Sequence, residues 1–397
     1  MNLSVIKLLV SYIFASFFVL NSYASSVNQK TKILETPDGE EQVLEKLSHD
    51  SLSGMEVVDN EITARYIRGI HLSAYSVSSR HYWNKFFDIF DTTELNAAVI
   101  DIKDESAVFI DAKAAKDKKT YTNRIPDLEH LVSQLKKRKV YTIARIVAFR
   151  DDLVVKSTPD FAVKNPDGTI WRDRQNVSWL DPYNEQVWEY VLDIAERAVD
   201  IGFDEIQFDY IRFPSDGSIR NCRYSKPYNS DLASEALVGF LKEANNRLKS
   251  KGANISIDVF GLTTTETSDM GIGQRITEMT KWVDFVSPMV YPSHYRKWAY
   301  GIADPNKSPY KTVYYALHGG VQRLPAEKFR PWLQDFSLGH KYKKEEVRQQ
   351  IQACYDNRIS SWLLWNARCV YTKEALKGQD EEYSYEASEP TIAENII

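Results

Sequence analysis

A segment near the middle of the chain, residues 202–214, alternates polar with apolar positions. At the period of a β-strand, one face carries Glu205, Gln207 and Asp209, and the other carries Ile206, Phe208 and Tyr210. A strand covered on both sides normally reads as a continuous apolar run, so this polar face must look into something other than packed core. Helical patterns flank the segment on both sides, which favours a parallel sheet over an antiparallel strand with one wet face.

Similar apolar runs recur along the chain and predict eight strands. We place them at residues 68–72, 97–102, 140–147, 205–212, 255–260, 282–291, 329–334 and 361–366. Amphipathic helical spacing separates several of them, as in the stripe of Leu128, Leu131, Val132 and Leu135 that follows Pro126. Eight strands alternating with helices predict an α/β fold, a (β/α)₈ TIM barrel. A doubly wound open sheet is the alternative, but no Gly-rich phosphate turn follows the first strand.

The two ends of the chain differ from this pattern. Residues 1–24 have a positive start, a short apolar run and small residues before a cleavage site expected after Ala24, which predicts a signal peptide and a secreted or periplasmic protein. An uncleaved anchor is the alternative, although the run is short for a bilayer and no second one follows. We expect residues 25–65 to be a linker or arm, residues 66–377 the barrel domain, and residues 378–397 an acidic mobile tail.

Composition narrows the possible partners. The net charge of −5 with dispersed Lys and Arg provides no basic field for nucleic acid. The three cysteines are too scattered for a disulfide framework or a zinc cluster, and whether Cys354 pairs with Cys369 stays open. None of the seven histidines has a metal-site spacing, and no Gly-x-Ser-x-Gly elbow occurs, so we expect no metal or other cofactor. Nine Trp and twenty-three Tyr suit a carbohydrate cleft as well as a large core.

The argument from strand faces extends to the neighbouring strands. If their aliphatic residues face the helices, a ring of polar side chains points into the upper barrel: Asp101, Lys103, Arg145, Gln207, Asp209 and Asp258. Buried charges are costly unless they are paired, so this ring is either a mutually neutralising network or a polar site open to substrate. Each residue alone fits both interpretations, whereas the set favours function.

Two carboxyl groups across a pocket are the minimum for cleaving a glycosidic bond. Asp209 suits the ionised role of nucleophile or base if Arg145, Arg212 or Lys103 lies close. The proton donor is either Asp258, which has the right strand face, or Glu266, which has the longer reach from a loop. A buried pair partner and a solvated loop charge are the structural alternatives for these two.

Aromatic and polar residues follow the sixth and seventh strands and should gather at the same rim. We expect Tyr291, His294 and Trp332 to contact substrate there, with Tyr295, Trp298 and Trp365 as further stacking platforms. Taken singly, each aromatic is more often a core residue than a ligand contact, and a lone loop histidine is more often a surface residue.

Seven ordered blocks resemble a family of bacterial envelope and secreted proteins that carries the name "putative glycoside hydrolase" domain and is distantly like the α-amylase superfamily. The blocks are residues 68–71, 93–104, 203–214, 258–261, 269–274, 286–294 and 330–336, and the resemblance covers about residues 66–370. It implies a TIM barrel that hydrolyses a polysaccharide or oligosaccharide.

The α-amylase pattern assigns a nucleophilic Asp to the fourth strand, a Glu acid to the fifth and a stabilising Asp to the seventh. By this resemblance, Asp209 matches the first and Asp335 the third. The chain departs from the pattern with Asp258 on the fifth strand and with Gln207 where an Arg usually precedes the nucleophile. These departures put the acid and a retaining mechanism in doubt, and they leave a catalytically inactive carbohydrate-binding barrel as the alternative function.

Overall fold

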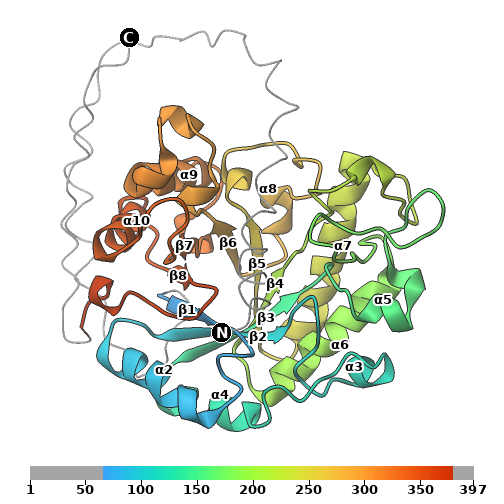
Figure 1. Ribbon diagram of the computed structural model, residues 1–397, viewed down its shortest axis with the longest axis horizontal. Helices are drawn as coiled ribbons and strands as arrows, with labels where there is room; N and C mark the ends of the chain where they lie inside the picture. The colour runs from blue at the N-terminus through green and yellow to red at the C-terminus, as the bar shows by residue number, and fades with distance from the viewer. Residues whose placement is uncertain (1–65, 379–397) are drawn as a thin grey trace.

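A computed structural model describes residues 66–378, and in it eight parallel strands close into a barrel in chain order. The strands are β1 (Arg68–Leu72), β2 (Ala97–Lys103), β3 (Tyr141–Val147), β4 (Glu205–Asp209), β5 (Asn254–Phe260), β6 (Phe285–Met289), β7 (Trp332–Gln334) and β8 (Trp362–Trp365). The α-helices are α2 (Arg80–Thr92), α3 (Lys113–Asp117), α4 (Leu128–Lys137), α5 (Val154–Ser157), α6 (Glu185–Ile201), α7 (Ser230–Lys249), α8 (Ile276–Met279), α9 (Pro309–Val321) and α10 (Lys344–Asp356). Short 3₁₀ turns lie at 159–161, 219–221, 261–264, 292–294, 299–301, 305–307, 326–328 and 373–375. Figure 1 shows the strands at the centre with the helices around them, which confirms the predicted (β/α)₈ class.

All eight predicted strands are present, but several are shorter than predicted. The fourth ends at Asp209 instead of residue 212, because Tyr210 adopts a left-handed backbone with φ of 51°. The sixth spans only Phe285–Met289, and the seventh begins at Trp332, directly after Pro331, which has no N–H to give to a strand ladder. The predictions for residues 1–24, 25–65 and 379–397 lie outside the described residues.

Outward side chains of the strands pack against the helices and form the main core. Ile206 and Phe208 of β4 are fully buried on this side, together with the apolar stripe of α6. That helix begins where the Asn184 side chain accepts a hydrogen bond from a backbone N–H, and it ends at Gly202, whose φ of 108° suits glycine. Local capping and the apolar stripe thus agree on where α6 lies.

The amino-terminal end of the barrel interior is closed by a buried ion pair. Arg330 Nη1 lies 2.8 Å from Glu205 Oε1, and neither side chain is exposed. Tyr141 and Ser256 donate further hydrogen bonds to the same carboxylate, at 3.1 and 2.6 Å. Glu205 therefore shares the inward face with Asp209, as predicted, but it belongs to a structural layer at the opposite end of the strand.

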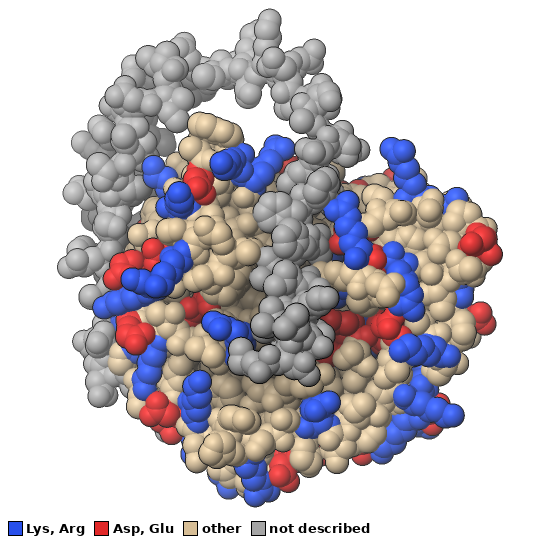
Figure 2. Space-filling view, in the orientation of Figure 1, with Lys and Arg blue, Asp and Glu red and all other residues tan. Residues whose placement is uncertain are grey.

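Three further observations concern the surface charges, the helices and the cysteines. Figure 2 shows Lys and Arg scattered over the visible face, with Asp and Glu between them. Within residues 66–378, no helix has both the length and the apolar character needed to cross a bilayer. All three cysteines are free and buried, so the structure contains no Cys354–Cys369 disulfide.

Candidate active site

Arg145 is the centre of a cluster of carboxylates at the carboxyl-terminal mouth of the barrel. Its Nη1 lies 2.6 Å from Asp101 Oδ1, its Nη2 and Nε lie 2.5 and 3.1 Å from Asp209 Oδ2, and its Nε lies 3.8 Å from Asp258 Oδ2. The strand ladder explains the grouping, because Asp101 pairs directly with Arg145, and the step after Phe208–Ile257 sets Asp209 beside Asp258. The structure thus brings together four of the predicted residues.

Asp258 differs from the other two carboxyl groups in its surroundings. It is 1 % exposed, and the indole N–H of Trp332 donates a hydrogen bond to its Oδ1 at 2.7 Å. Burial and the negative charge of Asp209 raise the pKa of Asp258 well above its usual range, and Arg145 offsets only part of this increase. Asp258 therefore holds its proton more tightly than an ordinary aspartic acid does.

His71 extends the cluster and was not selected by the sequence analysis. Its Nε2 lies 2.9 Å from Asp101 Oδ2, and its ring stacks on Trp365 with centroids 4.0 Å apart. Burial favours a lower pKa for His71, but the charge and hydrogen bond of Asp101 outweigh it and raise the pKa to about 9. Burial likewise opposes ionisation of Asp101, yet His71 and Arg145 together lower its pKa to about 2. Strand alternation could have found His71, because Ile70 and Leu72 on either side face outward.

The turn after β4 places a second group of cations beside Asp209. The backbone N–H of Tyr210 donates to Asp209 Oδ1 at 2.6 Å, and the Tyr210 ring has Arg150 at 5.3 Å and Arg212 at 4.9 Å. Arg150 is paired with Asp173 at 2.9 Å. Left-handed backbone at a residue other than glycine is costly and is often found at functional sites, as here next to a candidate catalytic carboxylate.

Tyr291, His294 and Gln207 line the same region. Tyr291 is buried. Burial raises the pKa of its hydroxyl group, and the negative charges of Asp258 and Asp209 raise this pKa further. His294 packs edge-on against Tyr291 and contacts Ser293 Oγ through Nδ1 at 3.0 Å, and burial lowers its pKa to about 4, so the imidazole is neutral at pH 7. Gln207 is fully buried and donates to Ser287 Oγ at 3.3 Å, while its Oε1 has no hydrogen-bond partner among the described residues.

The structure corrects the expected position of Lys103. A register shift on β2 between Asp101 and Lys103 turns the lysine away from the ring, and its Nζ lies 2.9 Å from Asp151 Oδ2 with neither side chain open to substrate. Trp332 is also buried, at 1 % exposure, so its role at the site is the hydrogen bond to Asp258 rather than stacking on a sugar.

Asp335 and Glu266 lie outside the Arg145 cluster. Both oxygens of Asp335 accept hydrogen bonds from Thr372, one from the hydroxyl at 2.6 Å and one from the backbone N–H at 2.8 Å. This carboxylate therefore holds the segment after β8 against the barrel. Glu266 has an exposed side chain in the loop after β5, and its carbonyl oxygen accepts a hydrogen bond from Arg323 at 2.8 Å. Their proposed catalytic roles stay predictions.

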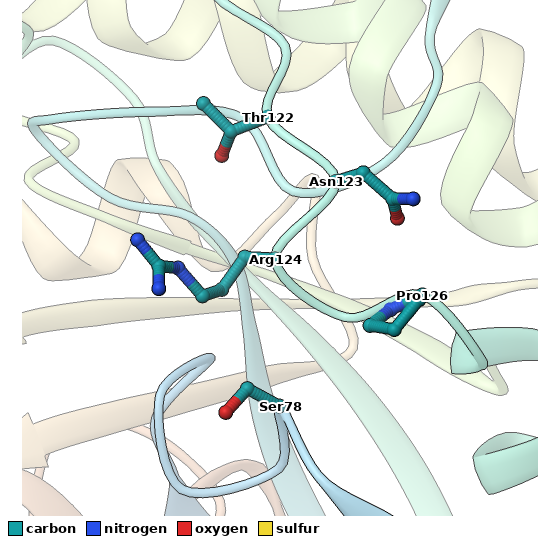
Figure 3. A pocket seen from close by; sticks show the side chains of 5 residues that line it. All are labelled: Ser78, Thr122, Asn123, Arg124 and Pro126. Atoms are coloured by element: carbon teal, nitrogen blue, oxygen red, sulfur yellow. The ribbon is translucent and has the colours of Figure 1, made fainter.

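Near this mouth, the loops after β1 and β2 enclose a polar hollow of about 390 Å³ (Figure 3). Its lining comprises Ser78, Thr122, Asn123, Arg124 and Pro126. Within residues 66–378, no group of three or more His, Cys, Asp or Glu side chains is arranged to hold a metal ion.

Comparisons with known proteins address the fold and the family. A family model described as "Putative glycosyl hydrolase domain" matches residues 69–371. The glycoside hydrolase domain of PgaB (BpsB) from Bordetella bronchiseptica is 14 % identical, with a TM-score of 0.60 over 76 % of this chain and 94 % of that one. A hypothetical protein from Ruminiclostridium thermocellum ATCC 27405 is 33 % identical over 48 % of this chain and 97 % of its own, with a TM-score of 0.43. A search of curated proteins gives no match. The likeness to the PgaB domain shows a shared barrel fold.

Proposed function

Because the chain belongs to the family described as "Putative glycosyl hydrolase domain", we propose that it hydrolyses glycosidic bonds in an envelope or extracellular polysaccharide. One observation carries the proposal: Asp209 and Asp258 lie together at the barrel mouth in different surroundings. Asp209 accepts two N–H groups from Arg145, whereas Asp258 is buried beneath the indole of Trp332, and burial together with the charge of Asp209 raises its pKa. A paired carboxylate and carboxylic acid are what glycoside cleavage requires.

The proposed roles of Asp258 and Asp209 follow from their different surroundings. Asp258 gives its proton to the leaving oxygen as the glycosidic C–O bond breaks. Asp209 either attacks the anomeric carbon, which retains its configuration, or takes a proton from the water that does so, which inverts it. Arg145 holds Asp209 in position and stays charged throughout. In this proposal the neutral imidazole of His294 contacts sugar hydroxyls, and the half-buried ring of Trp365, which stacks on His71, contributes to the apolar wall of the site.

Replacing Asp209 by Asn tests the proposal. Loss of the carboxylate removes a chemical step, so turnover of a polysaccharide hydrolysed by the wild type should fall by several orders of magnitude. The matched control is Asp160→Asn, which changes an exposed carboxyl group in the segment between β3 and α6, outside the Arg145 cluster. Full activity in the Asp209 variant would sink the assignment.

A carbohydrate-binding barrel without catalysis is the second candidate function. The observation that favours it is the burial of Asp258, which is 1 % exposed where the α-amylase pattern expects a Glu acid. A glycan array and a hydrolysis screen, run side by side on the wild type and on Asp209→Asn, separate the two functions. Binding by both proteins with product from neither supports the binding barrel, whereas product from the wild type alone supports the hydrolase.

Export is part of the same proposal. The pattern of residues 1–24 supports a secreted or periplasmic protein cleaved after Ala24. Expression of the full chain in a bacterial host, followed by cell fractionation and amino-terminal sequencing, should give an exported protein that begins at Ser25. A cytoplasmic protein that retains Met1 would contradict this.

A further inference from the structure

Arg212 is a buried cation without an acidic partner. Only 7 % of the residue is exposed, and no carboxylate among the described residues lies within ion-pair distance of it. Its guanidinium carbon lies 4.8 Å from the ring centre of Trp179, 4.9 Å from that of Tyr210 and 4.5 Å from that of Phe260. Burial lowers the pKa of Arg212, which marks the cost of keeping this charge away from water.

The other arginines inside the barrel and its loops are compensated differently. Arg145 contacts Asp101, Asp209 and Asp258, Arg150 contacts Asp173, and Arg330 contacts Glu205. Burying a guanidinium is costly unless an anion is brought with it. Three aromatic faces account for part of the compensation at Arg212, but residues 66–378 supply no anion within ion-pair distance of it.

The bonding of Arg212 leaves one edge of its guanidinium open. Nη1 donates to the Phe213 carbonyl oxygen at 3.2 Å and to Ser215 Oγ at 3.0 Å. The Nε and Nη2 groups have no partner within the described residues, and neither is sealed from solvent. These two nitrogens form the side-on fork that binds both oxygens of a carboxylate.

We propose that Arg212 binds the carboxylate of an acidic sugar, so that the substrate is a glycan containing uronic acid or another carboxylated residue. This inference rests on the proposed function, because it assigns a substrate class to the same site. The backbone of Tyr210 turns sharply between Asp209 and Arg212. The charge of Asp209 acts on Arg212, so the acidic sugar would lie close to the candidate catalytic carboxylate.

The charges around Arg212 set the specificity of this contact. Arg150, which also packs against the Tyr210 ring, adds positive potential, whereas Asp216 and Asp209 are nearby acids outside ion-pair distance. Arg145 already holds Asp209, so its carboxylate does not take up the open edge of Arg212. A neutral sugar in the same position would offer the fork only uncharged hydroxyl oxygens, whereas a carboxylate brings two oxygens and the missing negative charge, so the acidic sugar should bind more tightly.

Matched pairs of oligosaccharides test the inference by calorimetry on the Asp209→Asn protein, in which hydrolysis does not interfere. The probes are hexamers of galacturonate, glucuronate and mannuronate, each with its carboxyl-reduced neutral counterpart and a sulfated form of that counterpart. In at least one pair the acidic member should bind about tenfold or more tightly than the neutral one. Equal or absent binding of both members in every pair overturns the inference, and tighter binding of the sulfated form overturns the assignment to a carboxylate.

Variants then test whether Arg212 is the source of the preference for acidic oligosaccharides. Combining Arg212→Gln with Asp209→Asn should reduce the ratio of acidic to neutral binding affinity to about twofold or less. Arg212→Lys should keep only part of this preference, because an ammonium lacks the fork. Arg220→Gln makes the same charge change at an exposed position of the same loop and should leave the ratio intact. A ratio unchanged by Arg212→Gln overturns the inference. The comparison of acidic and neutral oligosaccharides on Asp209→Asn uses an intact Arg212, so it does not depend on the folding of the Arg212 variants. Hydrolysis by the wild type is measured separately and decides the proposed function.

Discussion

The indole N–H of Trp332 donates a hydrogen bond to Oδ1 of Asp258 across 2.7 Å, and both side chains are buried in the barrel mouth. The two residues come from β5 and β7, which lie on either side of β6 in the barrel. The bond fixes the orientation of the carboxyl group and opposes the increase in its pKa caused by burial and Asp209. Trp332 is therefore a positioning residue for the candidate acid.

Replacing Trp332 by Phe should move the alkaline limb of the pH profile. Without the indole N–H, the pKa of Asp258 should rise further, so the protonated acid persists to higher pH, and the alkaline limb of kcat/KM shifts the same way. Trp282→Phe, at a ring that packs outside the barrel against Lys242, is the matched control. A lower kcat with an unmoved limb would mean that Trp332 only fills space.

The ion pair at the other end of β4 should support stability and not chemistry. Glu205→Gln or Arg330→Met alone should lower the free energy of unfolding by about 3–5 kcal/mol, because each leaves a buried charge without its partner. The double variant should lose less than the sum of the two, and a denaturation cycle measures the coupling. Folded single variants should keep the wild-type pH profile; a changed profile would connect this layer to the site.

His71 predicts how stability depends on pH. Its pKa rises from 6.5 to about 9 on folding, so the stabilisation by the protonated ring is complete below pH 6.5 and is lost as the pH rises through 9. The free energy of unfolding should fall by up to about 3 kcal/mol across this window. His71→Gln should flatten the decline, whereas His130→Gln, at an exposed position of α4, should not. A Cys369→Ser background removes the titration of the thiol that lies against the same ring.

The sequence could predict which side chains meet in those places where strand alternation alone determines which residues point into the barrel. Asp101, Arg145, Asp209 and Asp258 converge because each lies on the inward face near the carboxyl end of a parallel strand. Lys103 departs from the pattern because a register shift reverses its face, which no periodicity in the sequence reveals.

The surroundings of Arg212 were beyond sequence reasoning for a different reason. The chain leaves β4 through the left-handed turn at Tyr210, and aromatic rings from three separate segments then enclose the guanidinium. The sequence analysis named Arg212 as a cation that could lie near Asp209, but only tertiary packing shows that it has no acidic partner within residues 66–378. The same holds for Asp335, whose hydrogen bonds to Thr372 link residues far from each other in any strand pattern.

The assignment of the acid can be decided by leaving groups. If Asp258 donates the proton, Asp258→Asn should reduce hydrolysis of natural glycans far more than that of nitrophenyl glycosides, because a nitrophenolate leaves with little protonation. Glu266→Gln, at the exposed loop position, is the matched comparison and should affect both substrates little. Asp258 has the raised pKa and a position fixed by Trp332, whereas the Glu266 side chain is exposed in a loop. Equal losses on both substrate types in Asp258→Asn, or the selective pattern in Glu266→Gln, would move the role away from Asp258.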